Sequence, residues 1–341
     1  MSIFHLPLVV FLLGANPALA KKKTTTESGK PAASKPQPHV RPSLREMGGR
    51  LQKSEEISAL FKESLKDPEA LTSKKLAVVE KPNSALLREF QNLALDSASF
   101  VRGEIEDEAV LSRLLSLQQL SLLRVRLWTQ DDSTPRNLGN IKEECNAWFQ
   151  FAADLPYNEA SMMGLKVTGL VRSLVLDELE RLETKRGAQM AEDEFWLHWF
   201  LLLRTPWPVD RMILTEARRV LHPASLNLAE KVAAKIQKNP YLSVDQALKQ
   251  IPGGKPQELD HLKPLWRTQD MEGMKMEINR LQTLRLRLAS RIYEKRKGSP
   301  PSSVEQLISE RLLTVAPTDY FTGHPMQLPQ AGKSGDTGKN P

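Results

Sequence analysis

The leucine spacing of residues 104–128 is the feature that most restricts the fold of this chain. After Gly103, acidic residues that suit a helix N-terminus lead into apolar residues three and four positions apart. The apolar residues are Leu111, Leu114, Leu115, Leu117, Leu120, Leu122, Leu123 and Trp128. Such spacing predicts one long helix with a wide buried face, and the sequence shows no convincing run of strict alternation that would predict a strand.

Helical spacing continues on both sides of this stretch. Further helices are expected at 53–66, within 81–101, and at about 140–154, 158–186, 190–204, 208–221, 225–238 and 243–250. Turn signals between them include Leu155-Pro156, Gly187 and Asn239-Pro240. We therefore predict an all-α fold, a multi-helix antiparallel bundle with a helical domain over residues 51–252. A helical solenoid is the alternative, but no fixed-period repeat supports it.

The first twenty residues have the form of a secretory signal. An apolar run, Leu6 to Gly14, precedes Ala18-Leu19-Ala20, which has the small-x-small form of a cleavage site. The expected mature protein begins at Lys21 and is periplasmic or extracellular. The alternative is an uncleaved anchor in the inner membrane, because the basic residues follow the apolar run instead of preceding it.

Residues 21–50 are expected to be a disordered basic linker, because they show no apolar periodicity. They hold eight basic and two acidic residues, and the tail 331–341, also expected to be disordered, has a net charge of +1. The chain carries +7, so residues 51–330 sum to zero. A neutral folded part argues against nucleic-acid binding. Lys21, Lys22 and Lys23 could instead contact an anionic membrane or a cell-wall polymer, unless the linker is only a solvated tether.

The most apolar stretch after the signal is FWLHWFLLLRTPWP, residues 195–208. Tryptophan is common at membrane interfaces, which makes an interfacial segment one interpretation. Nine apolar-rich residues are too few to span a bilayer, and acidic residues precede them as in a capped soluble helix. We expect a helix in the core.

Little in the sequence indicates catalysis, and no cofactor motif is present. The single cysteine, Cys145, lies on an apolar helical pattern and is expected to be a buried structural thiol. Glu194 and His198 are four residues apart, but two groups do not make a metal site, and a hydrogen bond between them is expected.

Adjacent acidic residues are the one pattern that could support an enzyme. They occur at Glu143-Glu144, at Asp177-Glu178 and at Glu192-Asp193-Glu194. Two carboxylates can hydrolyse a glycosidic bond, but on charged helices such residues are usually solvated. We expect solvated faces and keep a cell-wall hydrolase as an alternative.

Residues 253–330 are expected to form a long helix and a clasp. The long helix has apolar residues at Met274, Ile278, Leu281, Leu284, Leu288 and Ile292, and Gly298 can cap its C-terminus. A capping box of Ser302 and Glu305 then predicts a short helix. We expect Leu307, Leu312 and Phe321 to fold back onto the long helix.

The segment RLRLASRIYEKRKGSPPSSVEQLISERLLTVAPTDYFTGHP resembles the C-terminal pattern of type II secretion major pseudopilins and of uncharacterised bacterial envelope proteins. The matching residues are Tyr293, Gly298, Pro301, Ser303, Leu307, Pro317, Asp319, Phe321, Gly323 and Pro325, while Tyr320 replaces the usual proline. The resemblance covers about 45 of 341 residues. It implies an envelope protein, with Asp319 as a candidate calcium ligand, but not filament assembly, because some 270 residues precede the long helix.

Three functional hypotheses follow. The first is an exported helical scaffold, adaptor or binding protein with a protein partner in the envelope. The second is the cell-wall hydrolase that uses paired carboxylates. The third is a peripheral membrane protein that uses the basic linker and the Trp-rich segment.

Overall fold

The computed structural model describes residues 43–94, 104–131, 133–134, 136–158, 162–203, 213–214, 218, 223–239, 242, 244–253 and 268–328. The predicted signal, Lys21, Lys22 and Lys23 and the tail 331–341 lie outside these residues, as does most of the expected helix 208–221.

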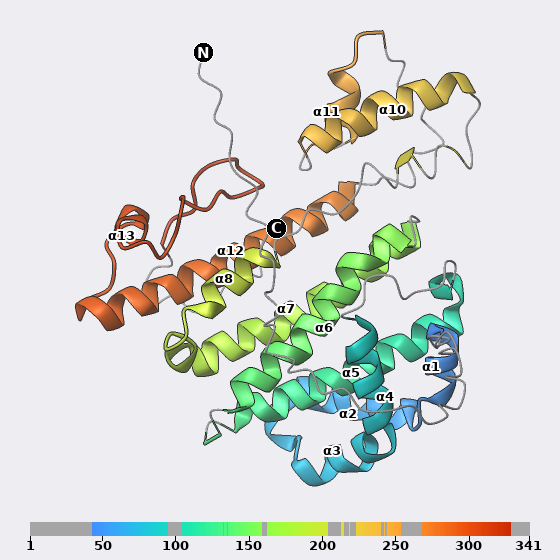
Figure 1. The fold of residues 1–341 in the computed structure, drawn as a ribbon, viewed down its shortest axis with the longest axis vertical. Coiled ribbons are helices and arrows are strands. Elements are labelled where there is room, and N and C mark those ends of the chain that lie inside the picture. Colours follow the sequence, from blue (N-terminus) through green and yellow to red (C-terminus); the bar gives the residue numbers. More distant parts are fainter. Residues whose placement is uncertain are drawn as a thin grey trace, which may run out of the picture. The chain divides into compact units, whose positions relative to one another are not determined.

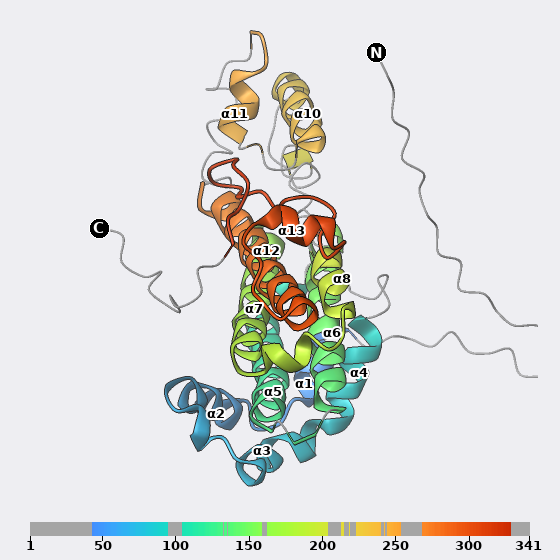
Figure 2. The ribbon, with the colours of Figure 1, turned by 90° about the vertical axis from the view of Figure 1, so that its left-hand side faces the viewer.

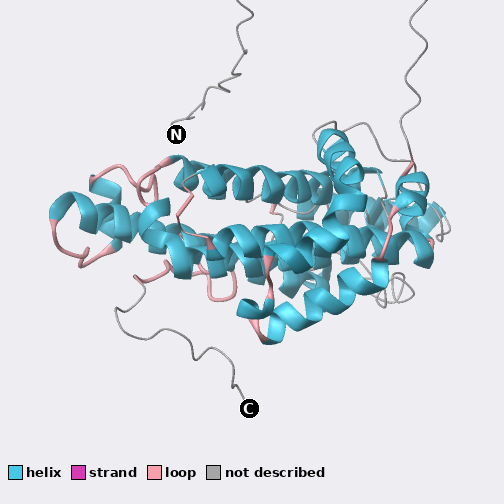
Figure 3. Cartoon of the chain, turned by 90° about the horizontal axis from the view of Figure 1, so that it is seen from below, coloured by secondary structure: helices cyan, strands magenta, loops and turns pink. Residues whose placement is uncertain are grey.

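The predicted all-α fold is confirmed, since all the regular secondary structure in the described residues is helical (Figures 1 and 3). One isolated bridge pairs Thr318 with Pro325. The α-helices are α1 (Leu44–Arg50), α2 (Ser54–Lys66), α3 (Ser73–Glu80), α4 (Ser84–Ala94), α5 (Glu108–Gln130), α6 (Arg136–Asn158), α7 (Met162–Met190), α8 (Phe195–Leu202), α10 (Pro223–Lys238), α11 (Val244–Lys249), α12 (Thr268–Lys297) and α13 (Val304–Ser309). Short 3₁₀ turns are η1 (Pro68–Ala70), η2 (Lys81–Asn83) and η3 (Glu104–Glu106).

Helix α1 corrects the prediction that residues 21–50 form a disordered linker throughout. Ser43 and Glu46 make a capping box, and the side chain of Glu104 accepts hydrogen bonds from the Leu44 and Arg45 amides at 2.9 and 3.3 Å. Leu44 and Met47 are buried. Two apolar residues and a capped N-terminus are therefore enough to fold this segment onto the bundle.

Helices α5, α6 and α7 pack against one another and form the centre of the bundle (Figures 1 and 2). Helix α4 adds Phe90, whose ring stacks on Trp148 of α6 with centroids 4.2 Å apart and lies 5.4 Å from the ring of Phe151. The three rings are buried, and such aromatic pairs stabilise a core beyond the area that they bury.

The helix break predicted at Leu155-Pro156 lies a few residues too early, because α6 ends at Asn158. Helix α6 continues through Pro156, whose missing N–H leaves the Ala152 carbonyl without its helical donor. The Thr168 hydroxyl of α7 lies 3.2 Å from that carbonyl oxygen, and its one hydrogen is shared with the Gly164 carbonyl at 2.8 Å.

The break predicted at Gly187 lies one residue too late, because the backbone of α7 leaves the helical region at Arg186, where φ is −125° and ψ is 18°. A Cβ atom at Gly187 would lie only 2.7 Å from Arg291 Nε. Glycine at this position also permits the close approach of α12.

The described part of the Trp-rich segment, residues 195–203, forms a core helix, as expected. Trp196, Trp199 and Phe200 of α8 are at most 4 % exposed, while Phe195 is 45 % exposed. Among the described helices, none combines the length and apolar composition that crossing a bilayer would require.

Buried apolar residues form two clusters. The larger one joins α1–α8 to Leu281–Ile292 of α12 and to α13. The smaller one joins α10 and α11 to Met274 and Ile278 of α12. The sequence predicted a domain boundary between residues 252 and 253. Each cluster contains residues from both sides of this boundary, and α12 contributes residues to both clusters.

The reversal after α12 follows the prediction. Gly298 takes a left-handed conformation with φ of 76°, and its amide bonds the Glu294 carbonyl at 2.7 Å. The expected capping box is wrong by one residue, because the N-cap of α13 is Ser303, without a side-chain cap. Gln306 instead accepts a hydrogen bond from the Ser302 amide at 2.7 Å. Leu307 and Leu312 are buried, as expected.

Candidate functional site

The acidic pair on α6 is divided between solvent and core. Glu143 is exposed, but Glu144 is buried, which contradicts the expectation of a solvated face. The Glu144 carboxylate accepts hydrogen bonds from Ser121, from Gln91 at 2.5 Å and from Arg124 at 3.0 Å. Burial raises the pKa of this carboxyl, and the Arg124 charge opposes the rise.

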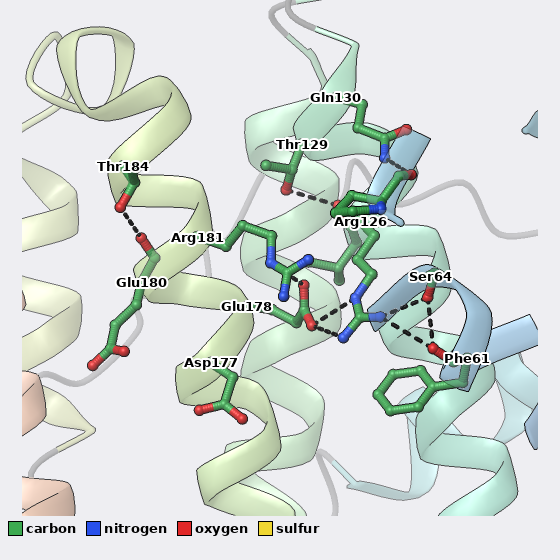
Figure 4. A network of polar contacts seen from close by, with 12 residues as sticks. Phe61, Ser64, Arg126, Thr129, Gln130, Asp177, Glu178, Glu180, Arg181 and Thr184 are labelled. Atoms are coloured by element: carbon green, nitrogen blue, oxygen red, sulfur yellow. Dashed lines mark hydrogen bonds and ion pairs between the residues drawn. The ribbon is translucent and has the colours of Figure 1, made fainter. Parts of the chain in front are cut away.

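The pair on α7 is divided in the same way. Glu178 is 1 % exposed and accepts a hydrogen bond from Arg126 Nε at 2.7 Å. Figure 4 shows Glu178 directed toward Arg126, whose guanidinium also reaches Ser64 at 2.6 Å and lies 4.3 Å from the ring centre of Phe61. Ser64 and Phe61 of α2 thus contact one buried charge pair that joins α5 to α7.

Further acidic residues attach α12 to α7 and to the connection between α7 and α8. Arg280 bonds Asp177 at 2.6 Å and Glu180 at 2.8 Å, and Arg291 bonds Glu183 at 2.9 Å. We call these contacts, with those made by Lys295 and Arg296, the α12 charge strip. The strip accounts for acidic residues of α7 and of the α7–α8 connection as elements of helix docking.

Glu194 belongs to this strip, which corrects the expected bond with His198. Its carboxylate pairs with Arg296 of α12, and His198 is exposed. No group of three or more potential metal-ligating side chains occurs in the part of the chain that is described.

Cys145 is fully buried, as expected for a structural thiol. Burial raises the pKa of this thiol well above its usual value, and the nearby charges of Glu144 and Glu178 raise it further. A thiol held in its neutral form is a poor nucleophile.

Asp319, the candidate calcium ligand, lies in the turn after α13. Its Oδ1 atom accepts hydrogen bonds from the Phe321 amide at 2.7 Å, from the Thr322 amide at 3.3 Å and from Asn279 Nδ2 at 3.0 Å. Asn279 of α12 in turn accepts a hydrogen bond from the Tyr320 amide at 3.0 Å. The carboxylate therefore organises the turn and joins it to α12.

Phe321 does not fold back onto α12, which corrects the expectation for the clasp. Its side chain is 53 % exposed. Tyr320 packs against the smaller apolar cluster instead, because the Asn279 amide fixes the backbone of the turn at that residue.

A pocket lies between α6, α7 and α8. Its volume is about 170 Å³, and its lining residues are Asn146, Phe149, Gln150, Ala153, Arg172, Trp199 and Leu203. We call it the α6–α8 pocket. The rings of Phe149 and Trp199 meet edge to face with centroids 6.4 Å apart, and Trp199 Nε1 donates to Asn146 Oδ1 at 3.2 Å.

Arg172 supplies the positive charge of this pocket. It is 2 % exposed, and its Nη2 atom lies 2.6 Å from the Leu203 carbonyl oxygen and 2.6 Å from Glu277 Oε1. Its Nε atom has no hydrogen-bond partner within the described residues. Burial lowers the pKa of this guanidinium, and the charge of Glu277 opposes the change.

The sequence carries signals for this pocket. Asn146, Phe149, Gln150 and Ala153 follow the i, i+3, i+4, i+7 spacing of one helix face, where two amides interrupt apolar residues. Arg172 falls on the same face of α7 as Val171 and Val175. Polar residues inside an apolar stripe are the pattern that marks buried polar chemistry.

Comparison with known proteins does not assign this chain to a family. No protein-family model, no curated protein and no solved structure matches this chain.

Proposed function

We propose that this chain is an exported helical scaffold and binding protein of the bacterial envelope, without catalytic chemistry of its own. The observation that supports this proposal is that basic side chains engage the acidic pairs. Glu144 and Glu178 are neutralised in the core, while Asp177, Glu192 and Glu194 bind basic residues of α12. Carboxylates engaged in this way hold helices together and are not free to act as an acid and a base.

The α6–α8 pocket supports a binding role. It combines two aromatic rings, two amides and one cation, a set that fixes a small molecule by shape and hydrogen bonding. Among the residues that the structure describes, its lining includes no carboxylate, hydroxyl or thiol. The envelope location rests on the signal-like residues 1–20 and on the resemblance of the C-terminal segment.

The catalytic alternative can be tested with peptidoglycan sacculi. We expect purified protein to release no more soluble fragments than the variants Glu143→Gln, Asp177→Asn and Glu192→Gln/Glu194→Gln. Release by the unchanged protein that disappears in one of these variants would establish the hydrolase and overturn the proposal.

Export can be tested by fusing residues 1–50 to a phosphatase that is active only outside the cytoplasm. We expect activity and cleavage after Ala20. An inactive fusion that retains Met1 would contradict an exported protein.

A further inference from the structure

We propose that α1 is an exchangeable element, which leaves the groove that holds it and occupies the same groove of a second copy of this chain. Two chains then associate by exchanging their first helices. This inference goes beyond the binding role proposed above and does not depend on it.

The groove that holds α1 is built by α4 and α5, and we call it the α1 groove. It is lined by Leu86, Phe90, Arg113, Leu114 and Leu117, and the residues that face it are Leu44, Met47, Gly48 and Leu51. The space left between the two surfaces is about 10 Å³, so the helix fits closely. Such a groove receives a short helix with apolar residues on one face, and each copy of the chain supplies one.

The polar contacts of α1 also lead to distant parts of the chain. Within the described residues, the hydrogen bonds and ion pairs that join residues 43–52 to other elements go to residues 83–107. They link the Leu44 and Arg45 amides to Glu104, Arg45 to Asp107 at 2.6 Å, Arg50 to Glu89 at 2.8 Å, and the Gln52 backbone to the Asn83 side chain at 2.9 Å in both directions. The groove of a second copy therefore offers α1 the same set of partners.

The link between α1 and α2 is short and strained. Lys53 is the one residue between Gln52 and Ser54, where α2 begins, and it takes the left-handed conformation with φ of 58° and ψ of 40°. This conformation is unfavourable for a residue with a Cβ atom. The reversal onto the same chain imposes it, whereas a link to a second copy leaves Lys53 in an ordinary conformation. Short links under strain favour exchange of this kind.

Cysteines across the groove distinguish an exchanged pair from a closed chain. A Cβ atom at Gly48 would lie 3.2 Å from Arg113 Cβ, close to the roughly 3.8 Å of a disulfide. One full-length chain carries Gly48→Cys and another carries Arg113→Cys. The two are refolded together from urea and oxidised afterwards, when the native Cys145 is buried. We expect a covalent heterodimer on non-reducing gels, because α1 of the first chain lies in the groove of the second.

Two controls locate the bond. Lys231→Cys at an exposed position of α10 replaces Gly48→Cys in the first control, and we expect no heterodimer. In the second, Gly48→Cys and Arg113→Cys are placed in one chain and oxidised in dilute solution. This variant should stay monomeric by light scattering, because the disulfide holds α1 in its own groove, and reduction should restore the exchange.

The hinge provides an independent test at a single position. Lys53→Gly removes the penalty of the left-handed conformation, so we expect the dimerisation constant to fall about tenfold for each hinge, or about a hundredfold for two. Lys53→Pro fixes φ near −65°, which excludes the closed link, and should convert most of the protein to dimers. Melting curves confirm that both variants are folded.

Three results would each overturn the proposal. The first is an intrachain disulfide in the double variant without any heterodimer in the mixed sample, which would show that α1 stays in its own groove. The second is equal dimerisation of Lys53→Gly and Lys53→Pro, which would place the contact on another surface. The third is a folded Lys53→Pro variant that remains monomeric, which would show that a released α1 does not bind a second copy.

Discussion

The two sides of α7 carry the same kinds of charged residue under different conditions. Glu178 faces Arg126 of α5, and the two side chains are 1 % and 2 % exposed. Its neighbour Asp177 faces Arg280 of α12, and these side chains are 51 % and 22 % exposed. Consecutive carboxylates in the sequence therefore belong to one core contact and one surface contact (Figure 4).

The difference shows what each contact can do. A buried pair loses the solvation of both charges, so its net contribution to stability is small while the loss of one partner is severe. An exposed pair contributes little energy and is weakened by salt. We infer that the α5 side fixes which helices pack together, and that the α12 charge strip adjusts how firmly α12 is held.

Breaking the buried pair should have the largest effect. Glu178→Ala leaves the Arg126 charge uncompensated in the core, and we expect the free energy of unfolding to fall by about 3–5 kcal/mol. Urea denaturation measures the change. The double variant Arg126→Met/Glu178→Leu should recover most of the loss, and failure to recover would show that the pair itself stabilises the fold.

The contrast between buried and exposed residues extends to the apolar side chains of the clasp. Leu307 is fully buried, so Leu307→Ala should lower the free energy of unfolding by about 2–5 kcal/mol. Phe321 is 53 % exposed, and Phe321→Ala should change it by no more than about 0.5 kcal/mol. Equal losses in thermal melts would mean that Phe321 packs onto α12 after all.

Removing a member of the charge strip should have a smaller effect. Arg280→Ala loses contacts with Asp177 and Glu180, whose side chains are 51 % and 37 % exposed. We expect a loss of about 0.5–1 kcal/mol in low salt that shrinks near 1 M NaCl. Lys231→Ala, at an exposed position of α10, is the matched control and should show no such salt dependence. A loss as large as that of Glu178→Ala would remove the distinction between the two sides of α7.

The smallest effect is expected at Asp319, where pH is the variable. The Phe321 amide, Asn279 and the Thr322 amide hold the pKa of this carboxyl below its usual value of 3.8. A lowered folded-state pKa stabilises the protein above pH 3.8, and this stabilisation is lost as the pH falls through the folded-state value. The gap in melting temperature between the unchanged protein and Asp319→Asn should therefore close below that pH.

The same pair of proteins tests calcium binding. If Asp319 only organises its turn, calcium should shift neither melting curve. A calcium-dependent stabilisation that Asp319→Asn abolishes would make the turn an ion site.

The helices and the reversal after α12 could be predicted from the sequence, because apolar spacing and Gly298 specify them locally. The division of the acidic pairs was missed, although Val175, Glu178, Leu179 and Leu182 share one helix face. That spacing places Glu178 in the core, but it does not identify Arg126 as its partner, since the two lie 52 residues apart. Sequence spacing likewise does not identify the pocket, because residues of three separate helices line it.

The charge strip also has a consequence for the order of folding. Its members on α7 and α12 lie 100 to 108 residues apart, whereas Ser121 and Glu144 of α5 and α6 lie 23 apart. Contacts that close long loops have a higher entropy cost, so we expect α5, α6 and α7 to assemble first and α12 to dock late. Contacts formed after the folding barrier act mainly on the rate of unfolding. Weakening the strip should therefore shorten the lifetime of the folded protein and leave its folding rate almost unchanged.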